Sequence, residues 1–150
     1  QRALAIMYED MHDTDHSDSL FLYMIHQNKN DAVGQNDYAY ILSERQETSI
    51  EELFFALELA ENAIKIEPDN AAFLDTIGWI YYKLGTYHKA EEYIKKSLNI
   101  NNNNPVILEH LGDIYVKMNK SSEAITIYKK VLSIDSDNQL IKNKINKIYE

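Results

Sequence analysis

Two histidines among carboxylates near the start of the sequence are the residues best suited to metal chemistry. The cluster consists of Glu9, Asp10, His12, Asp13, Asp15, His16 and Asp18. The spacing of His12 and His16 presents two ligands to zinc only when both stand on one continuous helix. The helical pattern instead predicts a turn from His12 to Asp15, which separates the two side chains. We therefore predict a solvated acidic turn and no metal site.

Other catalytic patterns are missing from the sequence. It contains no Cys, no glycine-rich phosphate loop, no HExxH pair and no Ser with a base in register. The run from Asp135 to Asn138 begins like a calcium loop but lacks the required Gly and the distal Glu. We expect no catalytic residue and no cofactor, and we expect that the protein is not an enzyme.

Charge is distributed unevenly along the chain, whose formal net charge is −9. Residues 1–70 hold 15 acidic and 4 basic residues, a balance of −11, and residues 71–150 hold 9 acidic and 11 basic residues, a balance of +2. An acidic surface repels phosphate backbones, so we expect no nucleic-acid partner. It favours neutral to basic peptides. No apolar stretch is long enough for membrane insertion.

A period of 34 residues relates two successive stretches of the chain, Ala71–Asn104 and Pro105–Asn138. The matched pairs are Leu74 and Leu108, Ile77 and Leu111, Gly78 and Gly112, Tyr81 and Tyr115, Ala90 and Ala124, Ile94 and Tyr128, and Leu98 and Leu132. Each period holds two helix-sized apolar patterns, which is typical of a helical repeat array. The matched Gly and Ala positions predict close packing of the two helices, with Gly78 facing Ala90.

The stretch LDTIGWIYYKLGTYHKAEEYIKKSL resembles the tetratricopeptide-repeat family. The resemblance implies an all-α fold, a right-handed superhelical α-solenoid of antiparallel helix pairs that serves as a protein-binding scaffold. It also implies that the first helix of each pair lines a concave groove. The longer run from Gly34 to Gly85 is similar to bacterial multi-repeat proteins of this family, some of which reside in the cell envelope. The location is thus left open between the cytoplasm and the bacterial periplasm or envelope.

The repeats divide a single predicted domain, residues 1–150, into five parts. These are a truncated repeat at 1–31, an extended repeat at 32–70, two regular repeats at 71–104 and 105–138, and a capping helix at 139–150. The extended repeat needs about five extra residues near Arg45–Glu52, which either lengthen its first helix or form a bulged turn.

Several residues predict where helices begin. Ser49 and Glu52 form a capping-box pattern. The other predicted starts are the caps Asn70, Thr86 and Asp137, the pair Asn104 and Pro105, and Ser121 or Ser122. In the last helix, Ile141, Ile145 and Ile148 form an apolar stripe, and Lys142, Lys144 and Lys147 are expected to face water.

The groove-facing positions implied by the family resemblance form the candidate peptide-binding site. They are Asn36, Tyr40, Glu44, Asp75, Trp79, Tyr82, Glu109, His110 and Asp113. Aromatic faces beside carboxylates suit Lys or Arg side chains. Trp79 has two interpretations, a seam-filling core residue or a groove contact, and His110 is interpreted as a plain surface histidine.

Some relatives bind carboxylate-ended tails through Lys, Asn and Arg on successive first helices. The matching positions here are Asn36, Tyr40, Thr76, Val106 and His110, none of which is Lys or Arg, so this function is not carried over. The first hypothesis is a scaffold that binds a partner peptide or protein segment in its concave groove. The alternatives are an assembly module that self-associates, giving a homo-oligomer, and a regulatory region of a larger multidomain protein.

Overall fold

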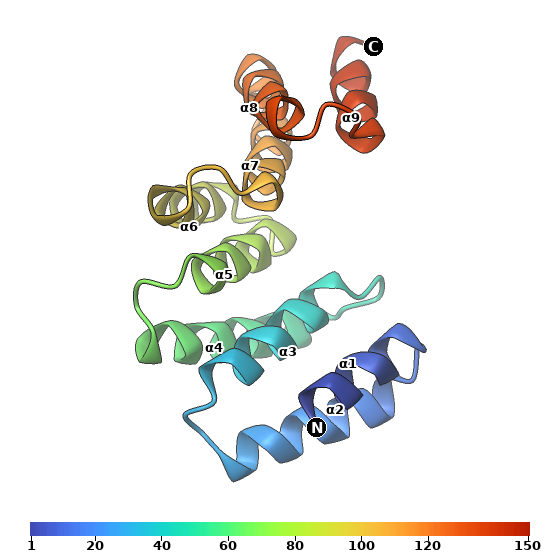
Figure 1. The fold of residues 1–150 in the computed structure, drawn as a ribbon, viewed down its shortest axis with the longest axis vertical. Coiled ribbons are helices and arrows are strands. Elements are labelled where there is room, and N and C mark those ends of the chain that lie inside the picture. Colours follow the sequence, from blue (N-terminus) through green and yellow to red (C-terminus); the bar gives the residue numbers. More distant parts are fainter. The chain divides into compact units, whose positions relative to one another are not determined.

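The computed structural model describes all residues, 1–150, as nine α-helices without a β-strand (Figure 1). The helices are α1 Arg2–Asp10, α2 Thr14–Gln27, α3 Ala32–Glu44, α4 Ile50–Ile66, α5 Ala71–Lys83, α6 Tyr87–Ile100, α7 Pro105–Lys117, α8 Ser121–Ile134 and α9 Gln139–Tyr149. The all-α prediction is confirmed.

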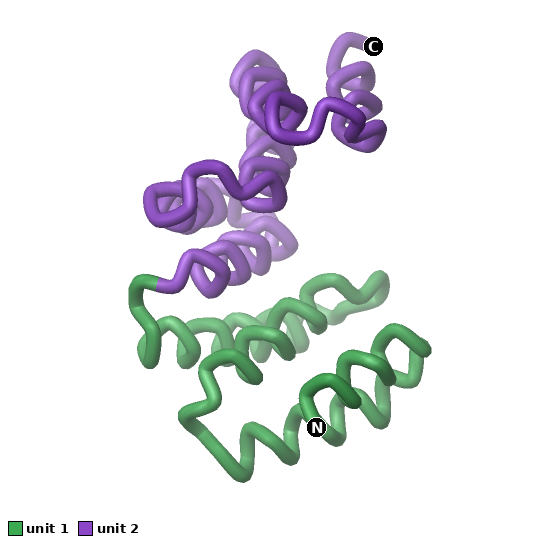
Figure 2. Tube along the Cα trace, in the orientation of Figure 1, with its two compact units in different colours: residues 1–69 green, residues 70–150 purple.

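The contacts divide the chain into two compact units, which are described separately (Figure 2). Unit 1, residues 1–69, consists of the helical hairpins α1–α2 and α3–α4, with α2 packed against α3. Unit 2, residues 70–150, consists of the hairpins α5–α6 and α7–α8, with α6 packed against α7 and α9 packed against α8. The repeat boundaries and the single domain stay predictions.

Local capping explains where most of these helices begin. The Glu52 backbone N–H donates to Ser49 Oγ at 3.1 Å and the Ser49 N–H donates to Glu52 Oε2 at 2.7 Å, so the predicted capping box is confirmed. The side chains of Asn70 and Asn104 cap α5 and α7 as predicted.

Two of the predicted caps differ in the structure. Thr86 occupies the cap position of α6, but its side chain makes no capping hydrogen bond. Asp137 was the wrong residue for α9, because Asn138 holds the cap position and its Oδ1 accepts the Ile141 N–H at 3.1 Å. Asp and Asn both cap helices well, so the residue types alone do not select between the two positions.

The extra residues of the second repeat lie in its turn and its second helix. The first helix α3 has 13 residues, the same as α5, so it is not lengthened. The second helix α4 has 17 residues where α6 has 14, and the α3–α4 turn spans Arg45–Ser49 where the α5–α6 turn spans Leu84–Thr86. Of the two alternatives, the longer turn is observed, together with a longer second helix.

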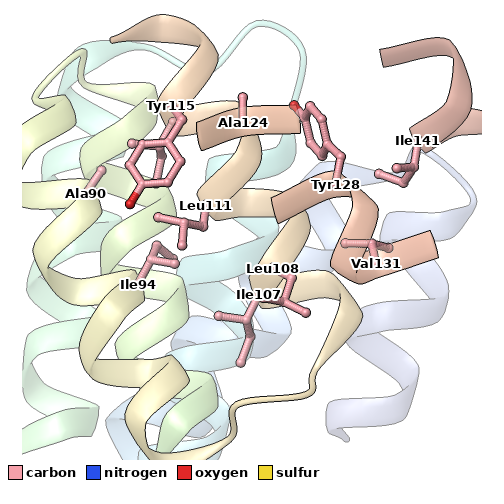
Figure 3. Packing of buried hydrophobic residues seen from close by; sticks show 11 residues of the cluster. Ala90, Ile94, Ile107, Leu108, Leu111, Tyr115, Ala124, Tyr128, Val131 and Ile141 are labelled. Carbon is pink, nitrogen blue, oxygen red and sulfur yellow. The ribbon is translucent and has the colours of Figure 1, made fainter. Parts of the chain in front are cut away.

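An apolar seam joins the hairpins of unit 2 (Figure 3). Its buried members are Ala90, Ile94, Ile107, Leu108, Leu111, Ile114, Tyr115, Ala124, Tyr128, Val131 and Ile141. A Cβ on Gly112 would collide with the Tyr128 ring, and a Cβ on Gly78 would lie 2.7 Å from Ile94 Cδ1 and 3.2 Å from the Ala90 carbonyl oxygen. The predicted close packing at the two glycines is therefore confirmed, because neither position has room for a side chain.

Unit 1 combines a buried aromatic stack with a partly buried ion pair. The Phe21 and Tyr38 rings stack with centroids 4.9 Å apart, and Phe21 is fully buried. Arg45, the first residue of the α3–α4 turn, donates two hydrogen bonds to Glu9 on α1 and two to Asp18 on α2, at 2.6–3.2 Å. This arginine therefore ties the second hairpin to both helices of the first.

Candidate functional site

Five of the six predicted site residues of unit 2 come together on α5 and α7. We call them the α5–α7 face, and they are Asp75, Trp79, Tyr82, His110 and Asp113, of which Asp75, Trp79 and His110 are buried. The Trp79 ring stacks on Tyr82 with centroids 4.5 Å apart and on His110 with centroids 4.1 Å apart. Asp75 Oδ1 lies 2.9 Å from His110 Nδ1 and shares a hydrogen bond with it. The face therefore carries an aromatic stack, and the buried hydrogen bond between His110 and Asp75 holds the histidine ring of that stack in place.

His110 and Trp79 are both more buried than groove contacts are expected to be. His110 is only 7% exposed, so its interpretation as a plain surface histidine is wrong. His110 is buried because α7, the first helix of the next repeat, packs beside α5 and places the histidine against Asp75 and Trp79. Trp79 is 8% exposed, which favours its interpretation as a seam-filling residue that supports Tyr82.

The carboxylates of α7 are held by a lysine from α9. Lys144 Nζ lies 2.7 Å from Glu109 Oε1 and 2.7 Å from Asp113 Oδ1. Tyr128 donates its hydroxyl proton to Asp113 Oδ1 at 2.6 Å. The prediction that Lys144 faces water is wrong, because α9 packs against α8 and the Lys144 side chain, 24% exposed, reaches the carboxylates of α7.

Protonation states in this cluster follow from burial and pairing. Burial lowers the pKa of Lys144, but hydrogen bonds to Asp113 and Glu109 outweigh it, so the pKa is raised overall. Burial, followed by the Asp113 hydrogen bond, raises the pKa of the Tyr128 hydroxyl above its ordinary value. Burial, with Asp113 nearby, raises the pKa of Tyr82 to about 12. The lysine therefore stays charged and the tyrosines stay neutral at physiological pH.

A pocket of about 310 Å³ opens beside this cluster. Its walls come from α5, α7, α8 and α9, and they are Tyr82, Asp113, Val116, Lys117, Tyr128, Lys144, Lys147 and Ile148. Apolar side chains and the Tyr82 ring can cover an aliphatic group here, while charged groups at the pocket bind polar atoms.

The remaining predicted site residues, Asn36, Tyr40 and Glu44, stand on α3 in unit 1. Asn36 is buried, and its Oδ1 atom has no hydrogen-bond partner. Tyr40 is partly buried and Glu44 is exposed. The structure thus brings together the predicted residues of α5 and α7, and a shared site with α3 stays a prediction.

The histidine and acid cluster of unit 1 has structural roles. His12 lies in the α1–α2 turn and His16 lies on α2, so the predicted break between them is confirmed. Asp13 accepts the His16 N–H and caps α2. The prediction of a fully solvated acidic turn is wrong for Glu9 and Asp18, because Arg45 binds both. No three His, Asp or Glu side chains are placed to hold a metal ion.

Sequence reasoning missed Tyr128 and Lys144 as parts of the site. A signal for Lys144 was available, because it follows Glu109 by 35 residues and Asp113 by 31, about one repeat period. Asp75 and His110 are likewise separated by 35 residues. Residues one period apart on successive first helices are neighbours in a stacked array.

Comparison with known sequences identifies repeat proteins. A family model described as anaphase-promoting complex, cyclosome, subunit 3 matches residues 53–131, just over half of the chain. A TPR repeat-containing protein of Pseudomonas aeruginosa is 33% identical over 75 residues, which covers 50% of this chain. The match spans only 12% of that protein's length.

None of the helices has the length and apolar character needed to cross a membrane.

Comparison with solved structures identifies the same fold. A thermophilic TPR protein from Thermus thermophilus superposes with a TM-score of 0.85 at 20% identity, over 99% of this chain and 79% of that one. The second TPR domain of human RPAP3, solved in complex with an HSP70 peptide, has a TM-score of 0.68 at 18% identity, over 79% of this chain and 95% of that one. These similarities confirm the predicted solenoid of tetratricopeptide type.

Proposed function

Because this chain belongs to the tetratricopeptide-repeat family represented by the matched subunit 3 model, we propose that it is a protein-interaction scaffold. Its α5–α7 face binds an extended or helical segment of a partner protein. The observation that carries this proposal is the Tyr82–Trp79–His110 stack beside the 310 Å³ pocket. A peptide complex of the human RPAP3 repeat domain, which has the same fold, supports a peptide as the ligand class.

Preorganisation is the physical reason for choosing this face. Trp79 is held between two rings, and His110 is held by Asp75, so little side-chain entropy remains to be lost when a ligand arrives. Tyr82 is the outer, partly exposed member of the stack and also lines the pocket. We assign Tyr82 as the aromatic anchor and Trp79 as its support.

The paired charges of the α5–α7 face favour an uncharged partner segment in direct contact with it. Asp75 pairs with His110, and Glu109 and Asp113 share Lys144, so these carboxylates are satisfied within the protein. The formal net charge of the chain, −9, adds a long-range attraction for a basic segment. The proposed partner is therefore neutral to basic, with an aliphatic or aromatic residue that enters the pocket.

The function proposed here is non-catalytic. The carboxylates and the histidine of the α5–α7 face are paired within the protein. The pocket beside the face combines aromatic and aliphatic side chains with the exposed lysines Lys117 and Lys147. Such a surface provides affinity through burial and stacking.

Selection of displayed peptides against the full chain tests the proposal. Fluorescence anisotropy with a selected peptide should show at least a roughly tenfold loss of affinity in Tyr82→Ala, because truncating an aromatic anchor typically costs ~2 kcal/mol or more of binding free energy. Tyr23→Ala, which removes an exposed tyrosine of α2, is the matched control and should bind normally. Unchanged affinity in Tyr82→Ala, with the fold intact by circular dichroism, would refute this site.

Self-association is a second candidate function, supported by exposed apolar side chains on the first and last helices. Met7 and Met11 on α1 and the α1–α2 turn, and Leu140 and Tyr149 on α9, are all exposed. Light scattering over a range of concentrations tests it, and a strictly monomeric chain would exclude it. A third candidate is a regulatory region of a larger protein. The match to the Pseudomonas relative, which covers only 12% of that longer protein, is compatible with this candidate.

A further inference from the structure

A cavity lies in unit 1, between the second helices of its two hairpins. It measures about 720 Å³ and runs between one face of α2 and one face of α4; we call it the α2–α4 groove. Leu22 and Ile25 form its α2 wall, and Phe55 and Ile66 form its α4 wall. On α4 the lining residues recur at intervals of three and four, so a continuous helical face is presented.

The apolar walls of this groove are open to water. Leu22 is 47% exposed, Phe55 38% and Ile66 41%. Three bulky apolar side chains meet at one open groove, an arrangement that suits contact with an apolar face of another macromolecule. The stretch from Phe55 to Ile66 is about 16 Å long at the helical rise, which matches about three turns of a docked helix.

Charge at the groove is opposite to that of the rest of unit 1. Residues 1–69 contain four basic residues against 15 acidic ones, and two of the four, Lys29 and Lys65, line the groove. The other two, Arg2 and Arg45, are used in ion pairs within unit 1. Glu58 is the one acidic residue of the lining.

The two lysines are available for a ligand. Lys65 Nζ makes a single weak contact, to Asn62 Oδ1 at 3.3 Å, and neither lysine is in an ion pair. Lys65 lies in the last turn of α4, and Lys29 follows the end of α2. Both helix ends lie on the same side of unit 1 (Figure 1), so the groove has an apolar length and a basic end.

We propose that the α2–α4 groove docks an amphipathic helix of a partner protein, one with an aliphatic face and carboxylates near one end. The aliphatic face covers Leu22, Phe55 and Ile66, and the carboxylates meet Lys29 and Lys65. This charge preference is opposite to that proposed for the α5–α7 face, so the two surfaces select different partners. The groove belongs to unit 1 alone and is independent of the scaffold site in unit 2.

The test uses the full chain and a labelled synthetic helix of about 14 residues, long enough to span the groove. The peptide carries leucines on one face and two glutamates at one end. Fluorescence anisotropy should show saturable binding that weakens roughly tenfold in Lys65→Glu, since charge reversal replaces an attraction by a repulsion. A peptide with lysines in place of the glutamates should bind weakly to the wild type and regain affinity for Lys65→Glu.

Matched control variants distinguish binding in the groove from non-specific hydrophobic binding elsewhere on the protein. Ile66→Ser should weaken binding at least fivefold or so, whereas Leu4→Ser, at an equally exposed position of α1, should not. Lys129→Glu on α8 controls for net charge, and Tyr82→Ala controls for the other site. The proposal is overturned if the lysine peptide binds the wild type as tightly as the glutamate peptide, or if Ile66→Ser and Lys65→Glu bind like the wild type.

Discussion

Unit 1 and unit 2 join their hairpins by different physical means. In unit 1 the buried Phe21–Tyr38 stack between α2 and α3 is supplemented by an ion pair. The guanidinium of Arg45, whose side chain is 15% exposed, bridges carboxylates on α1 and α2. In unit 2 the hairpins meet along the continuous apolar seam of Figure 3, where Gly112 lets the Tyr128 ring approach the backbone of α7. The charge balance follows the same division, because residues 1–70 carry the whole acidic surplus.

The comparison shows that one repeat fold accommodates two kinds of contact between successive hairpins, which we call joints. An apolar seam depends on volume, so it should be sensitive to changes of side-chain size and insensitive to pH. An ion-paired joint depends on charge and solvation, so it should respond to pH and to loss of one partner. The following substitutions test that division, each with urea unfolding and amide hydrogen exchange read separately for the two units.

Trp79→Ala should have the largest effect. Removing a nearly buried indole from between Tyr82 and His110 leaves a cavity, and the expected loss is about 3–5 kcal/mol in the free energy of unfolding of unit 2. Hydrogen exchange in α5 and α7 should accelerate. Trp79→Phe, which keeps an aromatic ring, should lose much less. A stable Trp79→Ala protein would instead make Trp79 a contact residue.

Arg45→Ala should have the second-largest effect. We expect the free energy of unfolding of unit 1 to fall by about 2–3 kcal/mol, because two partly buried carboxylates are left without their cation. Amide exchange should accelerate in residues 1–69 and stay unchanged in residues 70–150. An equal acceleration in both units would show that their stabilities are not separable.

The same ion pair should make the stability of unit 1 depend on pH. The hydrogen bond from Arg45, opposed by desolvation, holds the pKa of Glu9 below its ordinary value of 4.5. Since the folded pKa is the lower one, this contribution is complete above the unfolded pKa and is lost as pH falls through the folded value. Urea melts from pH 6 to pH 3 should show this loss in the wild type and a shallower decline in Arg45→Ala.

Gly112→Val should cost about 2 kcal/mol, because the added carbons collide with a buried aromatic ring that has no room to move. Gly78→Val should cost less, since its nearest neighbour is the terminal methyl of Ile94, which can rotate. The fluorescence of Trp79, the one tryptophan of the chain, reports unfolding of unit 2 in both variants. A smaller loss for Gly112→Val than for Gly78→Val would contradict the proposed seam geometry.

Ser49→Ala should have the smallest effect, about 1 kcal/mol, confined to unit 1. It removes the hydroxyl that accepts the Glu52 N–H at the start of α4. Ser49→Asp, which can also cap a helix, should restore most of the stability. Equal melting of the wild type and Ser49→Ala would mean that the long α4 is fixed by packing alone.

The sequence was sufficient for the features that depend on neighbouring residues or on the repeat period. Ser49 with Glu52, and Asn104 with Pro105, set helix starts through bonds that span three residues or fewer. The 34-residue period placed Gly78 and Gly112 at close contacts, because a repeated small residue has one packing explanation in a stacked array. The resemblance to the tetratricopeptide-repeat family, and not the period, indicated the side chains of the α5–α7 face as one group.

Only the tertiary structure decided which of those side chains are satisfied within the protein. His110 is buried by Asp75 and Trp79, Lys144 reaches two carboxylates of α7, and Arg45 binds acids 27 and 36 residues before it. The free energy of a charged or polar side chain depends on the groups that surround it in three dimensions, and residue type and spacing do not specify those groups. The period thus defined the array, and long-range contacts defined which of its surfaces remain open to a partner.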